Sequence, residues 1–243
     1  MSFLATLNEE GSYDLTTAGY VIFIVIMIAV LLLGTFLINK NHKFDAKKLA
    51  FSAIAIALAT VTSNIKLVHM PFGGSVTLLS MLFVTLIGYW FGLAAGLTSA
   101  FAYGILQLVM GPYIISIPQL LIDYIFAFTS LGLSGLFHMK KMIFVNEKTG
   151  KSHTISGLIP GYTVAVLARL FFSTLSGVIF FGTYAPENFP NPTVYSLIYN
   201  GSYMGLEAIL TLIIISIPPV AAALNHVKNL AVGNTANSAA SAN

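Results

Sequence analysis

The sequence contains little charge and no cysteine. Only 8% of its 243 residues are Asp, Glu, Lys or Arg, whereas 57% are hydrophobic, and the mean hydropathy is +0.87. A soluble protein carries about 25% charged residues to keep its surface hydrated, so this composition excludes a soluble globular protein and indicates a membrane protein. The absence of Cys excludes disulfides, thiolate catalysis and metal sites built on cysteine.

Long apolar runs account for most of the chain. Seven of them are long enough, or nearly so, to form transmembrane helices of about 20 residues. They cover residues 18–38, 48–64, 75–89, 92–110, 116–137, 154–181 and 194–217. Pro218 and Pro219 are expected to stop or kink the last helix. The first run follows Glu9, Glu10 and Asp14 instead of the basic residues of a secretory signal, so we expect it to remain as a helix.

These runs predict an all-α membrane protein with three parts. Residues 1–45 are expected to hold an outer N-terminal tail, an extra transmembrane helix and a cytoplasmic linker. Residues 46–228 are expected to form a six-helix membrane domain. Residues 229–243 are small, polar and low in complexity, which predicts a disordered cytoplasmic tail.

The basic residues indicate how the helices are oriented, because Lys and Arg favour cytoplasmic loops. Nine of the eleven lie in two loops and after the last helix: Lys40, Lys43, Lys47, Lys48, Lys140, Lys141, Lys148, Lys151 and Lys228. We therefore expect the N-terminus to lie outside the cell and the C-terminus to lie in the cytoplasm.

Two polar residues stand out within the helices on the outer side. Asp123 lies seven residues into a helix that begins at Ser116, roughly 10 Å below that end, and Asn200 is comparably deep in the last helix. Aromatic residues of neighbouring helices and loops share this leaflet. Together they predict an outward-facing pocket, although Tyr and Phe near a membrane surface also form the ordinary aromatic belt, and Asn200 could bond across helices.

The acid at position 123 is costly in this setting. A charge at that depth costs about 2.5 to 3.5 kcal/mol even on lenient scales, and such residues usually face a cavity or a partner. A structural alternative is an ion pair with Arg169, which lies in the middle of the sixth helix. Glu207, seven residues after Asn200, is a second candidate partner for Arg169. We favour the pair of Arg169 with Glu207, which leaves Asp123 for a ligand.

Several long stretches resemble a known family. They read "PFGGSVTL", "YGILQLVMGPYI", "PQLLIDYIFAFTSLGLSGLF", "SGVIFFGTYAPE" and "YSLIYNGSY". They are similar to the thiamine-specific S component of energy-coupling factor (ECF) transporters, the ThiT or YuaJ family. The resemblance covers about residues 48 to 225, six helices in the family's order, and implies the six-helix S-component bundle with one extra N-terminal helix.

The resemblance implies a substrate-binding membrane subunit without catalysis of its own or a cofactor. Thiamine would bind on the outer face, and a transmembrane coupling subunit with two ATPases would supply the energy. The family's pocket residues correspond to Tyr113, Tyr124, Tyr195 and Asn200 as they stand, and to Asp123, Tyr103, Ser173 and Phe181 with changes. The family commonly has Glu for Asp123 and often has His for Ser173. These departures leave the ligand open between thiamine and its pyrimidine or thiazole half.

The partner interface has its own signal. Ala53 and Ala57 lie four residues apart on the second helix, and small residues at this spacing let helices approach closely. The family docks its coupling subunit through such a pair, so the resemblance implies that role for these two residues.

Two other functions remain open from the residues alone. One is a secondary transporter, for example proton-coupled through Asp123, although neither an inverted repeat nor paired broken helices are evident. The other is an intramembrane enzyme that uses Asp123 and Glu207, which differ in depth. No metal site is predicted, because the five His are scattered at loops and helix ends.

Overall fold

In the computed structural model the protein consists of helices of very different lengths with short hairpins between them. The structure describes residues 5–7, 13–18, 21, 46–110, 112–138, 141–145, 152–186, 189 and 191–233. Four helical segments are long and apolar enough to cross a membrane: α2 (Ala46–Ser63), the segment Ile117–Phe137, α7 (Leu158–Phe180) and α8 (Pro192–Ser216). Two shorter apolar helices, α3 (Ser80–Phe91) and α4 (Leu93–Val109), lie among them. The prediction of a helical membrane bundle is confirmed.

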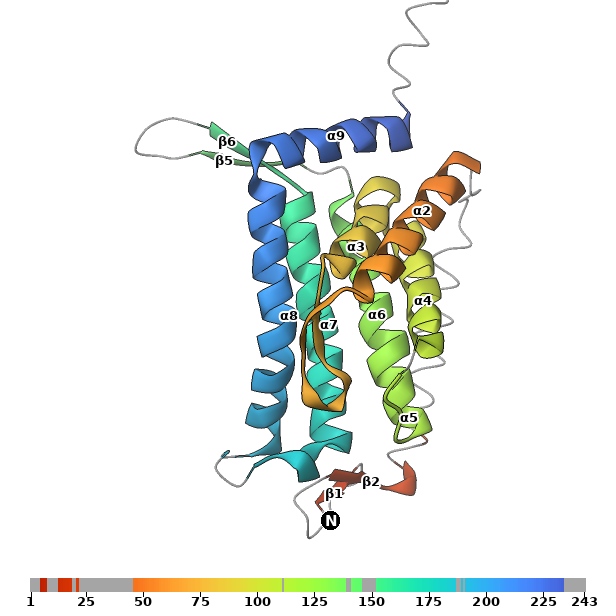
Figure 1. The fold of residues 1–243 in the computed structure, drawn as a ribbon, viewed down its shortest axis with the longest axis vertical. Coiled ribbons are helices and arrows are strands. Elements are labelled where there is room, and N and C mark those ends of the chain that lie inside the picture. Colours follow the sequence, from red (N-terminus) through yellow and green to blue (C-terminus); the bar gives the residue numbers. More distant parts are fainter. Residues whose placement is uncertain are drawn as a thin grey trace, which may run out of the picture.

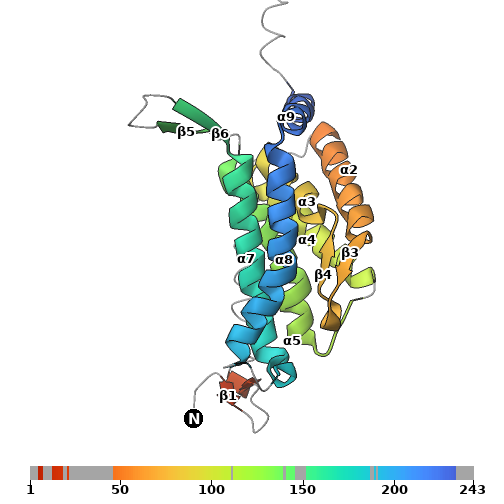
Figure 2. The same ribbon diagram turned by 60° about the vertical axis from the view of Figure 1, so that its left-hand side comes forward.

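The packing of these helices brings α7 and α8 side by side and sets α3, α4 and α7 against the segment Ile117–Phe137, while α2 packs against α3 and α4 (Figures 1 and 2). Glycines permit the closest approach in this core. A Cβ atom on Gly132 would lie 2.4 Å from the backbone N of Leu97, and one on Gly96 would lie 2.7 Å from the carbonyl O of Gly132. Small residues at helix contacts are typical of membrane bundles, because they let backbones meet.

The helix ends follow local signals in the sequence. The segment Ile117–Phe137 begins after Ser116, whose Oγ accepts a hydrogen bond from the backbone N of Gln119. α8 begins after Asn191, whose Oδ1 accepts from the N of Val194. Both helices carry proline in the first turn, where a missing N–H costs nothing.

The segment Ile117–Phe137 is continuous but not uniformly α-helical. It runs through α5 (Ile117–Leu120), a π-helical stretch (Leu121–Phe126), α6 (Ala127–Thr129) and a 3₁₀ stretch (Ser130–Phe137). Asp123 and Tyr124 lie in the π-helical stretch. Such wider turns are rare and occur frequently at functional sites.

Three two-stranded antiparallel hairpins supplement the helices: β1–β2 (Ala5–Leu7 and Tyr13–Leu15), β3–β4 (Lys66–His69 and Ser75–Thr77) and β5–β6 (Lys141–Val145 and Ser152–Ser156). Two of these correct the expected helix bounds. Residues 75–77 and 154–156 were expected to begin helices, but they form strands, and the helices begin at Ser80 and Leu158. Apolar composition alone does not separate a short strand from the first turns of a buried helix.

The end of the last long helix agrees with the proline signal and adds an element. α8 ends at Ser216, and a second helix, α9 (Pro218–Val232), begins directly after the extended residue Ile217. α9 lies across the end of the bundle, close to α2 and α3 (Figure 1). This helix was not expected. The expected first transmembrane helix, at residues 18–38, falls almost entirely outside the described residues, and the tail at 229–243 does so beyond Gly233.

Candidate ligand-binding site

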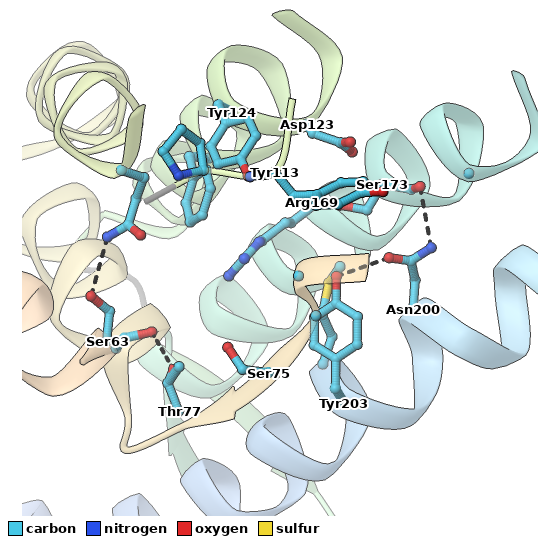
Figure 3. Close-up of a pocket in the computed structure, with 18 of the residues that line it drawn as sticks. Ser63, Ser75, Thr77, Tyr113, Asp123, Tyr124, Arg169, Ser173, Asn200 and Tyr203 are labelled. Atoms are coloured by element: carbon cyan, nitrogen blue, oxygen red, sulfur yellow. Dashed lines mark hydrogen bonds between the residues drawn. The ribbon is translucent and has the colours of Figure 1, made fainter. Parts of the chain in front are cut away.

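A cavity of about 170 Å³ opens in the half of the bundle where α2, α4 and α7 end and where α5 and α8 begin. It is closed on one side by the β3–β4 hairpin (Figure 3). The eight residues predicted as ligand contacts all line this cavity: Tyr103, Tyr113, Asp123, Tyr124, Ser173, Phe181, Tyr195 and Asn200. The fold thus brings together side chains that are up to 97 residues apart in the sequence.

The carboxylate of Asp123 is held by a neighbour on its own helix. Nε2 of Gln119 donates to its Oδ2 at 2.7 Å and also to the carbonyl O of Tyr113 at 3.1 Å, and Oε1 of Gln119 accepts from the N of Ile115 at 3.3 Å. Among the described residues, Gln119 is the hydrogen-bond donor to the Asp123 side chain. Since a carboxylate offers about four acceptor positions, Asp123 retains acceptor capacity for a ligand.

Aromatic rings line the same cavity as this acid. The backbone N of Tyr113 donates to the hydroxyl of Tyr124 at 2.8 Å. The ring of Tyr113 lies 6.0 Å from that of Phe181, and the ring of Tyr124 stacks on Phe128 at 6.2 Å. A wall of this kind attracts cations through the negative faces of the rings.

A second aromatic row was missed from the sequence. Tyr195, Tyr199 and Tyr203 occupy successive turns of α8 and all line the cavity, with ring centroids 6.1 and 5.8 Å apart. Only Tyr195 was predicted as a contact. The spacing of four residues was a usable signal, because residues at i and i+4 share one face of a helix.

Asn200 ties α7 to α8 within the cavity wall. Its Nδ2 donates to the carbonyl O of Ser173 at 3.2 Å and to that of Ser196 at 3.0 Å, and its Oδ1 accepts from the hydroxyl of Tyr203 at 2.8 Å (Figure 3). Both donor hydrogens of the amide are therefore used by the protein. A ligand would meet Asn200 through the remaining acceptor position on Oδ1.

Arg169 and Glu207 also line the cavity, and the expected ion pair between them is wrong. The guanidinium carbon of Arg169 lies 4.2 Å from the ring centroid of Phe128, and its Nε is buried without a hydrogen-bond partner among the described residues. The carboxylate of Glu207 instead accepts hydrogen bonds from Thr77, Ser80 and Met81. Sequence depth placed the two residues near each other, but only the packing determined their partners.

The β3–β4 hairpin contributes a wall that sequence analysis had assigned to a loop and a helix start. Gly73, Gly74, Ser75 and Thr77 line the cavity. A Cβ atom on Gly74 would lie 2.6 Å from the hydroxyl of Tyr199, so this close approach requires glycine. The stretch "PFGGSVTL" contains the signal, since a glycine pair before β-branched residues is typical of a tight turn into a strand.

A family model described as "Thiamine transporter protein (Thia_YuaJ)" matches residues 49–226 of the chain. The chain belongs to the Thia_YuaJ thiamine transporter family. Among curated family members, Thiamine transporter ThiT of Bacillus subtilis is 35% identical over 158 residues, which are 65% of this chain and 80% of that protein. Thiamine transporter ThiT of Lacticaseibacillus paracasei is 28% identical over 175 residues, which are 68% of this chain and 81% of that protein.

The fold of this member of the Thia_YuaJ family is similar to that of a solved structure. A structure of ThiT from Listeria monocytogenes, at 24% sequence identity, matches with a TM-score of 0.53 and covers 71% of this chain and 94% of that chain. At this identity the likeness concerns the fold alone. Family membership and the apolar helices together make the chain a membrane protein of a transporter family.

Proposed function

We propose that the protein is the substrate-binding membrane subunit of an ATP-driven ECF vitamin importer, and that it takes up thiamine. The observation that carries the proposal is the composition of one cavity in a member of the thiamine transporter family: the carboxylate of Asp123 and the rings of Tyr113, Tyr124 and Phe181 line it together. Its relatives in Bacillus subtilis and Lacticaseibacillus paracasei are named thiamine transporters.

Thiamine matches this cavity chemically. Its thiazolium ring is a permanent cation, which aromatic faces attract with about 2 kcal/mol or more once water is removed, and which a carboxylate neutralises. Its aminopyrimidine ring offers both donors and acceptors, and tyrosine hydroxyls serve both kinds. Arg169 adds a donor to the same cavity. A proton-coupled carrier would use the acid for protons, whereas the aromatic lining favours a cationic organic ligand.

The cavity opens outward in this proposal. Lys47 and Lys48, at the start of α2, and Lys228, on α9, lie at the other end of the bundle, and such residues favour the cytoplasm. The cavity lies towards the opposite end, among the last turns of α2, α4 and α7. Thiamine would therefore enter from outside the cell.

The coupling subunit would dock on α2. Ala53 and Ala57 are exposed on one side of this helix, while Ala55 and Ala59 pack into the core on the other. The exposed side of α2 is thus apolar, and at Ala53 and Ala57 its side chains are small enough for close contact with another helix, among larger exposed residues such as Ile54 and Leu58. The two ATPase subunits would act through that partner.

Uptake experiments test the class of transporter. Thiamine uptake that requires ATP and the co-expressed coupling proteins supports the proposal. Gradient-driven uptake by the purified chain alone, in vesicles without ATP, would instead establish a secondary transporter.

Calorimetric titration of the purified protein tests the ligand. We expect thiamine to bind more tightly than either its pyrimidine half or its thiazole half, because only the whole molecule engages both the acid and the polar groups of the cavity. Equal or tighter binding of one half would reassign the substrate to that precursor.

A further inference from the structure

Glu207 is a second carboxylate in the cavity wall, but the protein fills its acceptor positions. The residue is 2% exposed. Oε1 accepts from Oγ of Ser80 and from the backbone N of Met81, both at 3.2 Å, and Oε2 accepts from Oγ1 of Thr77 at 2.6 Å and from its N at 3.1 Å. Since a carboxylate has about four acceptor positions, Glu207 has none to offer a ligand, in contrast to Asp123.

The donors to Glu207 share one location, the junction between β4 and α3. α3 begins without a capping side chain, because Leu79 precedes it and leucine cannot accept a hydrogen bond. Leu79 has φ of 62°, a left-handed conformation that costs free energy for a leucine and persists only where its surroundings hold it. The carboxylate of Glu207 supplies the missing cap from α8, and a negative charge is favourable at a helix N-terminus.

α8 also holds the other end of the hairpin. The hydroxyl of Tyr199 donates to the carbonyl O of Pro71 and accepts from the N of Gly74 at 3.2 Å. Tyr199 and Glu207 are eight residues apart on α8, or about 12 Å along its axis. The hairpin is therefore attached to α8 at two levels, at its turn by a phenol and at its base by a carboxylate.

We propose that Glu207 is a positioning residue that sets the cavity wall. Its carboxylate keeps β4 and the first turn of α3 against α8, and this contact places Gly74, Ser75 and Thr77 at the cavity. The attachment itself does not depend on the identity of the ligand. Its consequence for binding rests on the proposed function: a wall held in place slows the dissociation of thiamine.

Hydrogen exchange without ligand tests the attachment. Glu207→Gln retains the shape of the side chain but turns an amide donor towards the donors of Thr77 or Met81. We expect amide exchange in residues 66–78 and at Met81 to become roughly 10- to 100-fold faster, because hydrogen bonds to a buried charge are lost. The amides in the middle of α8 should keep their wild-type rates.

Two further variants keep this test decisive. Thr77→Val removes the shortest of the four hydrogen bonds and leaves the carboxylate in place, so it reports on the same contact even if Glu207→Gln fails to fold. Thr211→Val is the matched control, since Thr211 is buried on α8 and its hydroxyl bonds to the backbone O of Glu207 within the helix. Wild-type exchange of the hairpin in folded Glu207→Gln or, failing that, in Thr77→Val would overturn the proposal.

Ligand kinetics provide a second readout. In Glu207→Gln we expect thiamine to dissociate roughly 10- to 100-fold faster, with an association rate within a few-fold of wild type, because the charge of Asp123 is unchanged. An unchanged dissociation rate in a variant whose hairpin exchanges faster would overturn the consequence for binding. If wild-type protein does not bind thiamine, the proposed function fails while the exchange experiment still decides the role of Glu207.

Discussion

Replacing Asp123 by asparagine separates the charge of this side chain from its shape. The Oδ1 atom of asparagine can still accept the hydrogen bond that Nε2 of Gln119 donates at 2.7 Å, so the local geometry of the helix is expected to survive. What disappears is the negative charge beside the aromatic wall. The substitution therefore measures the contribution of that charge to thiamine binding.

The magnitude follows from the position of the acid. Two unit charges about 4 Å apart attract each other by about 1 kcal/mol in water and about 4 kcal/mol near a protein surface. Asp123 is partly buried in the cavity, so we expect a loss between these limits, about 1.5 to 3 kcal/mol, as for a hydrogen bond to a charged group. This corresponds to a roughly 10- to 100-fold higher Kd for thiamine.

Calorimetry suits this measurement better than intrinsic fluorescence. The chain has one tryptophan, Trp90, which is 4% exposed, packs edge-on against Phe51 and does not line the cavity. Titrating the uncharged pyrimidine half shows which ring meets the acid: a loss confined to thiamine places the carboxylate at the thiazolium. Unchanged thiamine affinity in Asp123→Asn would refute the reasoning and make the acid structural.

Three other perturbations address the interface, the packing and the orientation. Ala57→Trp should abolish thiamine uptake without changing thiamine binding. Leu58→Trp, whose side chain is turned by about 100° from that of Ala57 on α2, should retain uptake. Equal uptake in both variants would refute the docking surface proposed on α2. Gly177→Ala should lower the melting temperature, since its Cβ would lie 2.0 Å from a side-chain oxygen of α8, whereas Gly205→Ala, with nothing within 4 Å, should stabilise by about 0.5–1 kcal/mol. Asn225→Cys in this cysteine-free chain should escape an impermeant thiol reagent in intact cells, and labelling there would reverse the topology.

The long helices of this protein were predictable because the membrane imposes them. A chain with 8% charge and repeated apolar runs must satisfy its backbone hydrogen bonds internally, and a helix does so within one segment. The end of α8 followed equally well, because Pro218 cannot continue this helix. The strands at 66–69 and 75–77 pair with each other around a glycine turn that leaves a signal in the sequence, but the position of β4 against α8 is set by packing.

The residues of the site likewise include some that the sequence identified and some whose contacts it did not predict. Asp123 was identified from the sequence because an acid in an apolar helix is costly wherever the helix packs, and its aromatic neighbours followed from the family resemblance. The partners of Arg169 and Glu207 could not be identified from the sequence, because the depth of a residue along a helix does not determine which face of the helix it occupies. Packing turned Glu207 towards the start of α3 and Arg169 over the ring of Phe128.

The sequence by itself thus determined the environment of the protein, its long helices and the acid of its cavity, since each follows from the cost of placing charge or unpaired backbone in lipid. Only the tertiary structure decided which carboxylate is available. Asp123 accepts a hydrogen bond from Gln119 and keeps acceptor positions, whereas the four acceptor positions of Glu207 are filled. Hydrogen-bond satisfaction depends on neighbours brought together by packing, which no single stretch of sequence specifies.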